Sequence, residues 1–526
     1  MIHPHIRFPL PHRLLIKIVC LGSLAIFYLA MFRPTEQNIF SISFVDEAAN
    51  FTTGAWVARG AKMYEDFFLL HQPTTTLISA VIQKAIPLNS IFLLVKRHRE
   101  FVFVFSFLSS AFLVWRFGPM GLFFAFFYEL TKFTLFGNLF LAETLSIPPL
   151  LYCIGLVYER VKHRAEKVRL IDILFFLASL LFIQFTLLPL AFFVLFALLM
   201  FFSLSSSKER KKVFFLGSLV TMATLLAFSH FVSFAEYVRQ TVAFTTTQFI
   251  PGEELHQSLA TLVSQIFLFP IHALFLPNEG FFLIFKFFCV LFIILSLFLS
   301  RKRTLLVLLA YLLLVLTNTR PRPFALFYQG FHFLPLYASL VWIALLHLET
   351  FAEGVKQTVG KIAVYAVPLV ILGVIIFPYG YKEFTRSNDP KTDWYVNYSP
   401  FFDYGETLRL LALPTDTLMV IPDVPLLYWQ SGFKSNSLYF YTYGFMYKNP
   451  IISNQLLYYF RIHPPSFIYD ERDLLADELI GTYAKEAYIP VLLRGKPSRL
   501  YVRKDSIPTI LSTQWKQVER YGFSLH

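Results

Sequence analysis

The side chains best suited to chemistry in this sequence follow its first apolar stretch. Asp46 and Glu47 are adjacent, and the runs Tyr64-Glu65-Asp66-Phe67-Phe68 and His71-Gln72-Pro73 come shortly after them. Ionisable groups within a membrane cost about 2.5–3.5 kcal/mol each at a helix centre, so such groups at a membrane edge indicate a function. A carboxylate in this segment can serve as a general base toward a hydroxyl or an amine.

The composition places these residues in a membrane protein. Of the 526 residues, 56% are hydrophobic and 15% are charged, whereas about a quarter of the residues of a soluble domain are charged. Residues 381–526 nevertheless hold 16 of the 46 Lys and Arg and 15 of the 33 Asp and Glu. The sequence therefore predicts a polytopic α-helical membrane body at 1–380 and a small water-facing α/β domain at 381–526.

Several classes of function are disfavoured. The net charge of +13 comes from short basic loops between apolar stretches and forms no separate basic face, which argues against a nucleic-acid partner. Cys20, Cys153 and Cys289 all lie in apolar stretches, so neither a zinc site nor a disulfide framework is expected. No glycine-rich nucleotide-binding pattern occurs, which argues against direct use of ATP or a sugar nucleotide.

Eleven apolar stretches are candidates to cross a bilayer, for which roughly 17–25 residues are needed. They are 14–32, 100–116, 118–136, 142–158, 170–186, 187–203, 212–231, 280–300, 304–319, 323–347 and 361–378. Basic clusters at 160–169, 208–212 and 301–303 share one side of this arrangement and are expected in the cytoplasm. The segment 33–73 and the domain 381–526 then lie outside a multi-pass protein of the plasma (inner) membrane.

One basic cluster does not fit this topology. Lys96, Arg97, His98 and Arg99 fall on the outer side. Either 74–95 is itself a span, or these cations face an anion outside; the second alternative keeps the other three clusters consistent. The stretch 74–88 is then interpreted as a helix in the membrane interface.

Other charged residues are expected on the same outer side as this cluster. They include Arg320, Arg322, Glu143 and His332. Guanidinium groups bind phosphate through two hydrogen bonds, so the set suits group transfer from a lipid-linked anion. The alternatives stay open: Arg320 and Arg322 as contacts to lipid headgroups, Glu143 as a helix N-terminal acid, and His332 as a core residue.

The acidic motif Asp46-Glu47 and the pattern from Gly60 to Pro73 resemble the GT-C glycosyltransferases. The similarity is greatest to bacterial relatives of protein O-mannosyltransferases and to the lipid A aminoarabinose transferase. Ala142-Glu143-Thr144-Leu145, Gln184-Phe185-Thr186 and His332-Phe333-Leu334-Pro335-Leu336 agree with it, and the resemblance covers roughly residues 1–380.

The resemblance implies a hexosyl- or pentosyltransferase that uses a polyprenyl-phosphate sugar donor and inverts the anomeric carbon. Asp46 takes the role of general base and Glu47 that of positioning the acceptor. Lys96, Arg97 and Arg99 would contact the donor phosphate. The acceptor is a glycan, a lipid or a protein.

Asp66 and His71 are interpreted as further substrate-binding residues of this segment. The alternative for His71 is a cap of the helix that begins at Pro73. Gln184 stands where relatives often carry a lysine, which weakens a phosphate-binding role for that span. No metal is required, although Mg²⁺ or Ca²⁺ could bridge paired carboxylates and phosphate.

The C-terminal part is predicted as strands and one helix. Strands are expected at 416–423, 465–470 and 498–504, and a helix at 474–488. Tyr428-Trp429 suits either carbohydrate stacking or packing of the fold. A lipid-linked glycan flippase without glycosyl transfer is the alternative function, but no internal repeat supports it.

Overall fold

The computed structural model describes residues 10–163, 168–249, 259–277, 280–319, 330–355, 358–377, 389–421, 424–440, 450–471 and 478–525. The chain forms two compact units. We call the first the helical unit; it consists of 1–38, 99–224 and 257–387. The second, which we call the mixed unit, consists of 39–98, 225–256 and 388–526. The C-terminal residues therefore share a unit with the segment that carries Asp46.

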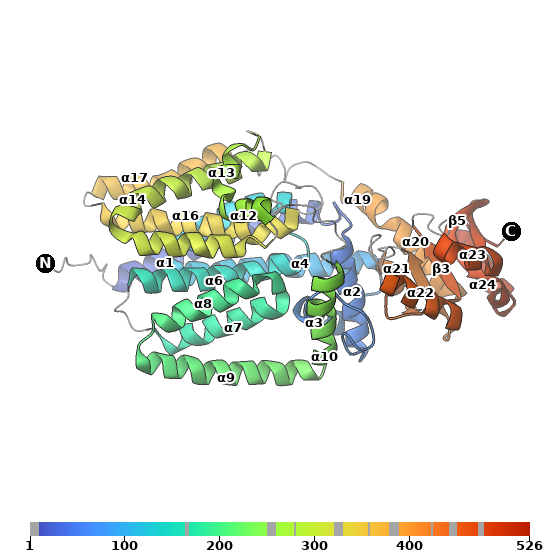
Figure 1. Cartoon of the computed structure of the whole chain (residues 1–526). Helices are drawn as coiled ribbons and strands as arrows, with labels where there is room; N and C mark the ends of the chain where they lie inside the picture. Colours follow the sequence, from blue (N-terminus) through green and yellow to red (C-terminus); the bar gives the residue numbers. More distant parts are fainter. Residues whose placement is uncertain are drawn as a thin grey trace. The chain divides into compact units, whose positions relative to one another are not determined.

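The helical unit contains most of the long apolar helices (Figure 1). Its elements, including two helices whose ends continue into the mixed unit, are α1 (Leu10–Gln37), α4 (Ile91–Phe117), α5 (Pro119–Thr131), η1 (Lys132–Leu135), α6 (Ala142–Lys162), α7 (Leu170–Thr186), η2 (Leu188–Leu190), α8 (Ala191–Ser203), α9 (Ser207–Ser229), α12 (Leu259–Phe267), α13 (Phe269–Leu274), α14 (Gly280–Thr317), η4 (Gly330–Phe333), α16 (Leu334–Gly354), α17 (Thr358–Ile371) and η5 (Leu372–Ile376).

Five stretches of the described chain are long and apolar enough to cross a membrane. They are Leu14–Gln37, Ile91–Phe117, Ser207–Ser229, Gly280–Thr317 and Gly330–Gly354. The predicted helical membrane body is confirmed, whereas the number of spans and their sidedness stay predictions. The interfacial helix predicted at 74–88 corresponds to α3 (Pro73–Ala85), whose 13 residues extend only about 20 Å, less than the roughly 30 Å of a hydrocarbon core.

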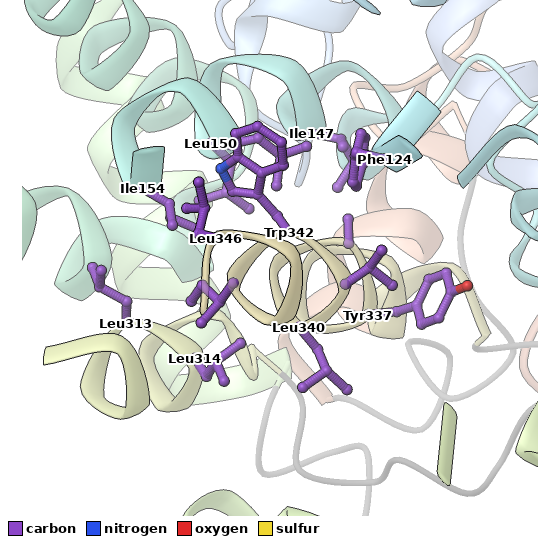
Figure 2. Close-up of a cluster of buried hydrophobic side chains, with 14 of the residues drawn as sticks. Phe124, Ile147, Leu150, Ile154, Leu313, Leu314, Tyr337, Leu340, Trp342 and Leu346 are labelled. Carbon is purple, nitrogen blue, oxygen red and sulfur yellow. The ribbon is translucent and has the colours of Figure 1, made fainter. Parts of the chain in front are cut away.

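Helix α16 lies at the centre of the helical unit. Its Trp342 is fully buried and makes edge-to-face contacts with Phe117 and Phe124, at centroid distances of 5.2 and 5.7 Å. Figure 2 shows Trp342 directed toward Ile147 and Leu150 of α6. Because α16 is covered by protein rather than by lipid, it can hold polar side chains in fixed positions.

Helix α14 is broken where the sequence predicts a loop. The spans expected at 280–300 and 304–319 form one helical run in which Arg303 has non-helical angles, φ −143° and ψ 45°. Arg301, Lys302 and Arg303 are a cationic cluster that is costly to place in hydrocarbon. The break therefore occurs at the basic turn between the two predicted spans.

The mixed unit combines helices with one sheet (Figure 1). Its elements are α2 (Val45–Ala58), α3, α10 (Phe234–Tyr237), the π-helix η3 (Val238–Phe249), α19 (Pro390–Asn397), α20 (Ser399–Leu411), β1 (Thr417–Ile421), α21 (Leu426–Ser431), β2 (Lys434–Ser435), α22 (Pro450–Ile462), β3 (Phe467–Asp470), α23 (Glu478–Ala487), β4 (Tyr488–Leu493), β5 (Lys496–Arg503), η8 (Lys504–Thr509), α24 (Ser512–Val518), η9 (Glu519–Tyr521) and β6 (Phe523–Ser524).

The sheet has the strand order β2-β1-β3-β5-β4-β6. Strand β1 pairs in parallel with β2 and β3, and the remaining pairs are antiparallel. Strands β1 and β3 are buried along nearly their whole length, as expected for parallel strands covered on both faces. The three predicted strands and the predicted helix are confirmed as β1, β3, β5 and α23, and the sequence interpretation missed β2, β4 and β6.

Helices α2 and α3 pack closely, and buried polar side chains contact one another where they meet. The Thr53 and Thr76 hydroxyls lie 3.1 Å apart, and the Ser79 hydroxyl lies 2.9 Å from His98 Nε2. The close approach occurs at Gly54, where an added Cβ would come within 2.4 Å of Ser79 Oγ and 2.6 Å of Ser79 Cβ. Glycine at this position therefore sets the α2–α3 distance.

We expect Gly54→Ala to destabilise the protein by about 1–3 kcal/mol, the usual cost of overpacking. The added methyl must displace Ser79, which also accepts a 3.0 Å hydrogen bond from Gln83 Nε2. The measurement is the free energy of unfolding of the detergent-solubilised protein in a denaturing-detergent titration. Gly22→Ala in α1 is the matched control, because nothing lies within 4 Å of its added Cβ. Equal losses in both variants would contradict the packing argument.

Candidate active site

Asp46 and Glu47 lie in the first turn of α2. Negative charge is favourable there because the unpaired N–H groups and the helix dipole make a helix N-terminus electropositive. Glu47 is fully buried, whereas the Asp46 side chain is 13% exposed and His71 Nε2 lies 3.6 Å from its Oδ1. The structure thus brings together Asp46 and His71, which the sequence separates by 25 positions. Of the two adjacent carboxylates, Asp46 is the more accessible to a substrate.

The segment that carries His71 is held by a tyrosine and a glutamine. The Tyr64 hydroxyl donates to the His71 carbonyl at 2.7 Å, and Tyr64 itself is buried with a positive φ of 70°. Gln240 of η3 donates to the Tyr64 carbonyl at 2.7 Å and accepts from Leu69 N–H at 3.0 Å. The sequence interpretation missed Gln240, since a single glutamine in a polar stretch carries no motif.

Asp66 takes a local structural role. Its Oδ2 accepts a 2.6 Å hydrogen bond from the Lys62 N–H, and its side chain is exposed. The neighbouring Glu65 is also exposed and pairs with Lys62 at 2.9 Å. In the described part of the chain no hydrogen bond or ion pair joins Asp66 to Asp46 or His71. These local contacts therefore do not support the predicted substrate-binding role of Asp66, which stays a prediction.

Lys96, Arg97 and Arg99 all belong to helix α4 rather than to a loop. Arg97 is exposed, Lys96 is half-buried and Arg99 is 2% exposed. The predicted span began at residue 100, whereas α4 begins at Ile91. Lys and Arg are good helix formers, so a hydropathy boundary at a basic cluster does not end the helix.

In the helical unit, Glu143 pairs with His332. Glu143 lies in the first turn of α6, and its Oε1 is 2.7 Å from His332 Nδ1, with both side chains at least 84% buried. His332 lies in the short helix η4, which precedes α16, and not well inside a span as the sequence interpretation placed it. The two motif residues are therefore one buried pair. Arg320 and Arg322 lie outside the described residues.

A second buried ion pair was missed by the sequence interpretation. Lys132 Nζ and Glu129 Oε2 lie 2.7 Å apart, with side chains 3% and 2% exposed. Ser106 donates to Glu129 at 2.5 Å and accepts from Lys132 at 3.3 Å, and the Tyr28 hydroxyl donates to Ser106 at 3.3 Å. The available signal was two opposite charges three residues apart inside the stretch predicted as a span at 118–136.

No metal-binding group is formed by the residues described: none of their His, Cys, Asp and Glu side chains gather in threes or more where a metal ion could be held. The divalent cation considered for Asp46 and Glu47 stays a prediction. The described residues provide a mostly buried, partly accessible carboxylate (Asp46) beside an imidazole (His71). In the other unit they provide a buried carboxylate–imidazole pair, Glu143 and His332.

The fold defines a class: a helical membrane protein with a small C-terminal sheet. It resembles a solved structure, that of ArnT from Cupriavidus metallidurans in the apo state, with a TM-score of 0.52 and 9% sequence identity. The match covers 92% of this chain and 98% of that one. The fold implied by the sequence resemblance, a polytopic helical body followed by a small C-terminal α/β part, is thereby confirmed. No protein-family model and no curated protein sequence matches the chain.

Proposed function

We propose that this protein is a membrane glycosyltransferase that moves a sugar from a polyprenyl-phosphate donor to an acceptor. The observation that carries the proposal is Asp46 at the start of α2 with His71 beside it, in a chain whose fold resembles ArnT over nearly its whole length. The absence of nucleotide-binding glycine patterns from the sequence supports a lipid phosphate as the leaving group.

In the proposed reaction Asp46 removes the proton from the acceptor hydroxyl or amine. The freed electron pair attacks the anomeric carbon with inversion, and the bond from that carbon to the phosphate oxygen breaks. The pair of electrons in that bond leaves with the polyprenyl phosphate. Positioned general-base catalysis of this kind contributes about 10²–10⁴-fold to a rate.

The supporting groups take distinct roles in this proposal. His71 orients the Asp46 carboxylate, and Glu47 at the same helix end helps to position the acceptor. Lys96, Arg97 and Arg99 offer cations from α4 for the developing phosphate charge, which guanidinium and ammonium groups stabilise well. We place the reaction at the outer face of the plasma membrane, where the positive-inside rule puts this segment.

The test of this proposal uses purified wild-type protein in lipid nanodiscs. The protein is incubated with radiolabelled polyprenyl-phosphate pentoses and hexoses together with an extract of envelope glycans and lipids. We expect release of polyprenyl phosphate and transfer of label to an acceptor, and no transfer from the corresponding sugar nucleotides. Transbilayer movement of the donor in vesicles with no transfer would replace this proposal by the flippase alternative.

A further inference from the structure

The mixed unit contains a cavity that the proposed reaction does not use. Its volume is about 190 Å³, and it lies between the C-terminal end of α2, the loop before α4, and the helices α20 and α21. Its lining includes Arg59, Glu406, Arg409, Trp429 and Gln430. Arg59 and Asp46 are 13 positions apart at opposite ends of α2, about 20 Å along the helix axis. The cavity is therefore separate from the general base.

Hydrogen bonds between distant segments hold the walls of this cavity. Gln430 Nε2 donates to Glu406 Oε1 at 2.6 Å, while Gln430 Oε1 accepts from the Ile91 N–H at 3.0 Å. Thr52 of α2 donates to the Pro425 carbonyl, just before α21, at 2.8 Å. Gln430 thus joins α20, α21 and the start of α4. Because these bonds fix the walls, the cavity is already formed without a ligand.

The close approach of α20 to α21 adds to this rigidity. A Cβ added at Gly405 would come within 2.5 Å of Gln430 Cβ, so glycine is required for the two helices to meet. Preformed sites with a few converging polar groups are typical of small-ligand binding.

The cavity carries one uncompensated positive charge. Arg409 pairs with Glu406 at 2.5 Å, and Glu406 is 94% buried, so this pair contributes no net charge. Arg59 is exposed and forms no ion pair within the described part of the chain. Guanidinium groups favour carboxylate and phosphate oxygens, which they bind through two parallel hydrogen bonds. The complementary ligand therefore carries a negative charge.

Trp429 supplies an apolar wall beside these charges. Its Nε1 donates to Gln83 Oε1 at 2.7 Å, its side chain is half-buried, and none of the described aromatic rings stacks on it. The neighbouring Tyr428 is fully buried, and its hydroxyl accepts from the Val420 N–H at 3.1 Å. Burial raises the pKa of Tyr428 to about 12, so it serves as a neutral core residue. Of the two aromatics only Trp429 is available to a ligand.

We propose that this cavity binds one anionic sugar ring, a uronic acid or a sugar phosphate, with the acid group on Arg59 and the ring against Trp429. The volume of 190 Å³ is below the roughly 300–1,000 Å³ of sites for drug-sized ligands, which limits the occupant to a single ring or headgroup. The anionic sugar could be free or could be the terminal residue of an envelope glycan, since both present the same acid group and ring to the cavity. The site is independent of glycosyl transfer.

The experiment is calorimetric titration of the full-length protein in detergent. The probes are glucuronic acid, glucose 1-phosphate, methyl glucoside and inorganic phosphate. We expect the two anionic sugars to bind at least tenfold more tightly than methyl glucoside and inorganic phosphate. Equal binding of inorganic phosphate would overturn the sugar assignment, and absence of binding by every probe would overturn the site.

Variants assign the binding to the cavity. Arg59→Ala and Trp429→Ala are each expected to weaken glucuronic acid binding at least tenfold, with melting temperatures near wild type as the check of folding. Arg520→Ala removes an exposed arginine outside the cavity and is expected to bind like wild type. Unchanged binding by Arg59→Ala would reject the assignment. Asp46→Asn is expected to bind glucuronic acid like wild type, because the cavity lies at the other end of α2. The binding result therefore does not depend on whether the proposed transferase activity is found.

Discussion

Replacing Asp46 with asparagine is expected to lower the rate of sugar transfer by about 10²–10⁴-fold, because an amide cannot accept the acceptor proton. The change preserves shape, and Asp46 is partly exposed, so the fold should persist. The loss should fall on kcat more than on KM, since the base acts in the transition state. Steady-state release of polyprenyl phosphate, with a melting curve of the same preparation, measures both effects.

The matched control for this loss is Glu65→Gln in the same segment. Glu65 is exposed and, among the residues that the structure describes, pairs only with Lys62, an interaction worth about 0–1 kcal/mol. Its variant should retain wild-type turnover. If Asp46→Asn keeps full activity while transfer by the wild type is established, another group is the base, and Glu47 and Glu143 become the candidates to test.

The second large effect is expected at the buried pair Glu129–Lys132. Lys132→Met should destabilise the protein by about 3–5 kcal/mol, since the substitution leaves the Glu129 carboxylate buried without its cation. The side chain of Glu129 is only 2% exposed, so water cannot compensate. The free energy of unfolding in a denaturing-detergent titration measures the loss.

A double variant separates the charge effect from packing. Glu129→Gln combined with Lys132→Met removes both charges, and most of the stability should return, because no buried charge is then left without its partner. Lys62→Met, which breaks an exposed pair, is the control and should cost no more than about 1 kcal/mol. A double variant as unstable as Lys132→Met would show that the hydrogen bonds donated by the Lys132 ammonium group, and not the unpaired Glu129 charge, account for the loss.

In the C-terminal part, local sequence patterns predicted those strands and helices whose own residues carry a clear apolar run or helical periodicity. The strand prediction at 416–423 corresponds to β1, whose Leu418–Ile421 are all buried, because a continuous apolar run suits a strand covered on both faces. The helix prediction at 474–488 overlaps α23. Strand β4 was missed since Tyr488–Leu493 contains Pro490 and lacks strict alternation.

The sequence predicted the arrangement of the candidate site less completely than the secondary structure, because that arrangement depends on contacts between distant residues. Asp46 and His71 were both named from a motif, and their approach to 3.6 Å depends on how Tyr64 and Gln240 hold the intervening segment. Asp66 belongs to the same motif but caps a local turn. The motif therefore identified the candidate residues, whereas the contacts of the segment between α2 and α3 determined which of them lie close to Asp46.

By itself the sequence determined that this is a helical membrane protein with a small C-terminal sheet and a carboxylate segment after its first apolar stretch. These properties follow from composition and from short-range periodicity. Only the tertiary structure decided that Glu143 meets His332 and that Arg59 and Trp429 share a cavity. Those pairs are joined by packing between segments 189 or more positions apart, and side-chain contacts over such distances leave no trace in local propensity or hydropathy.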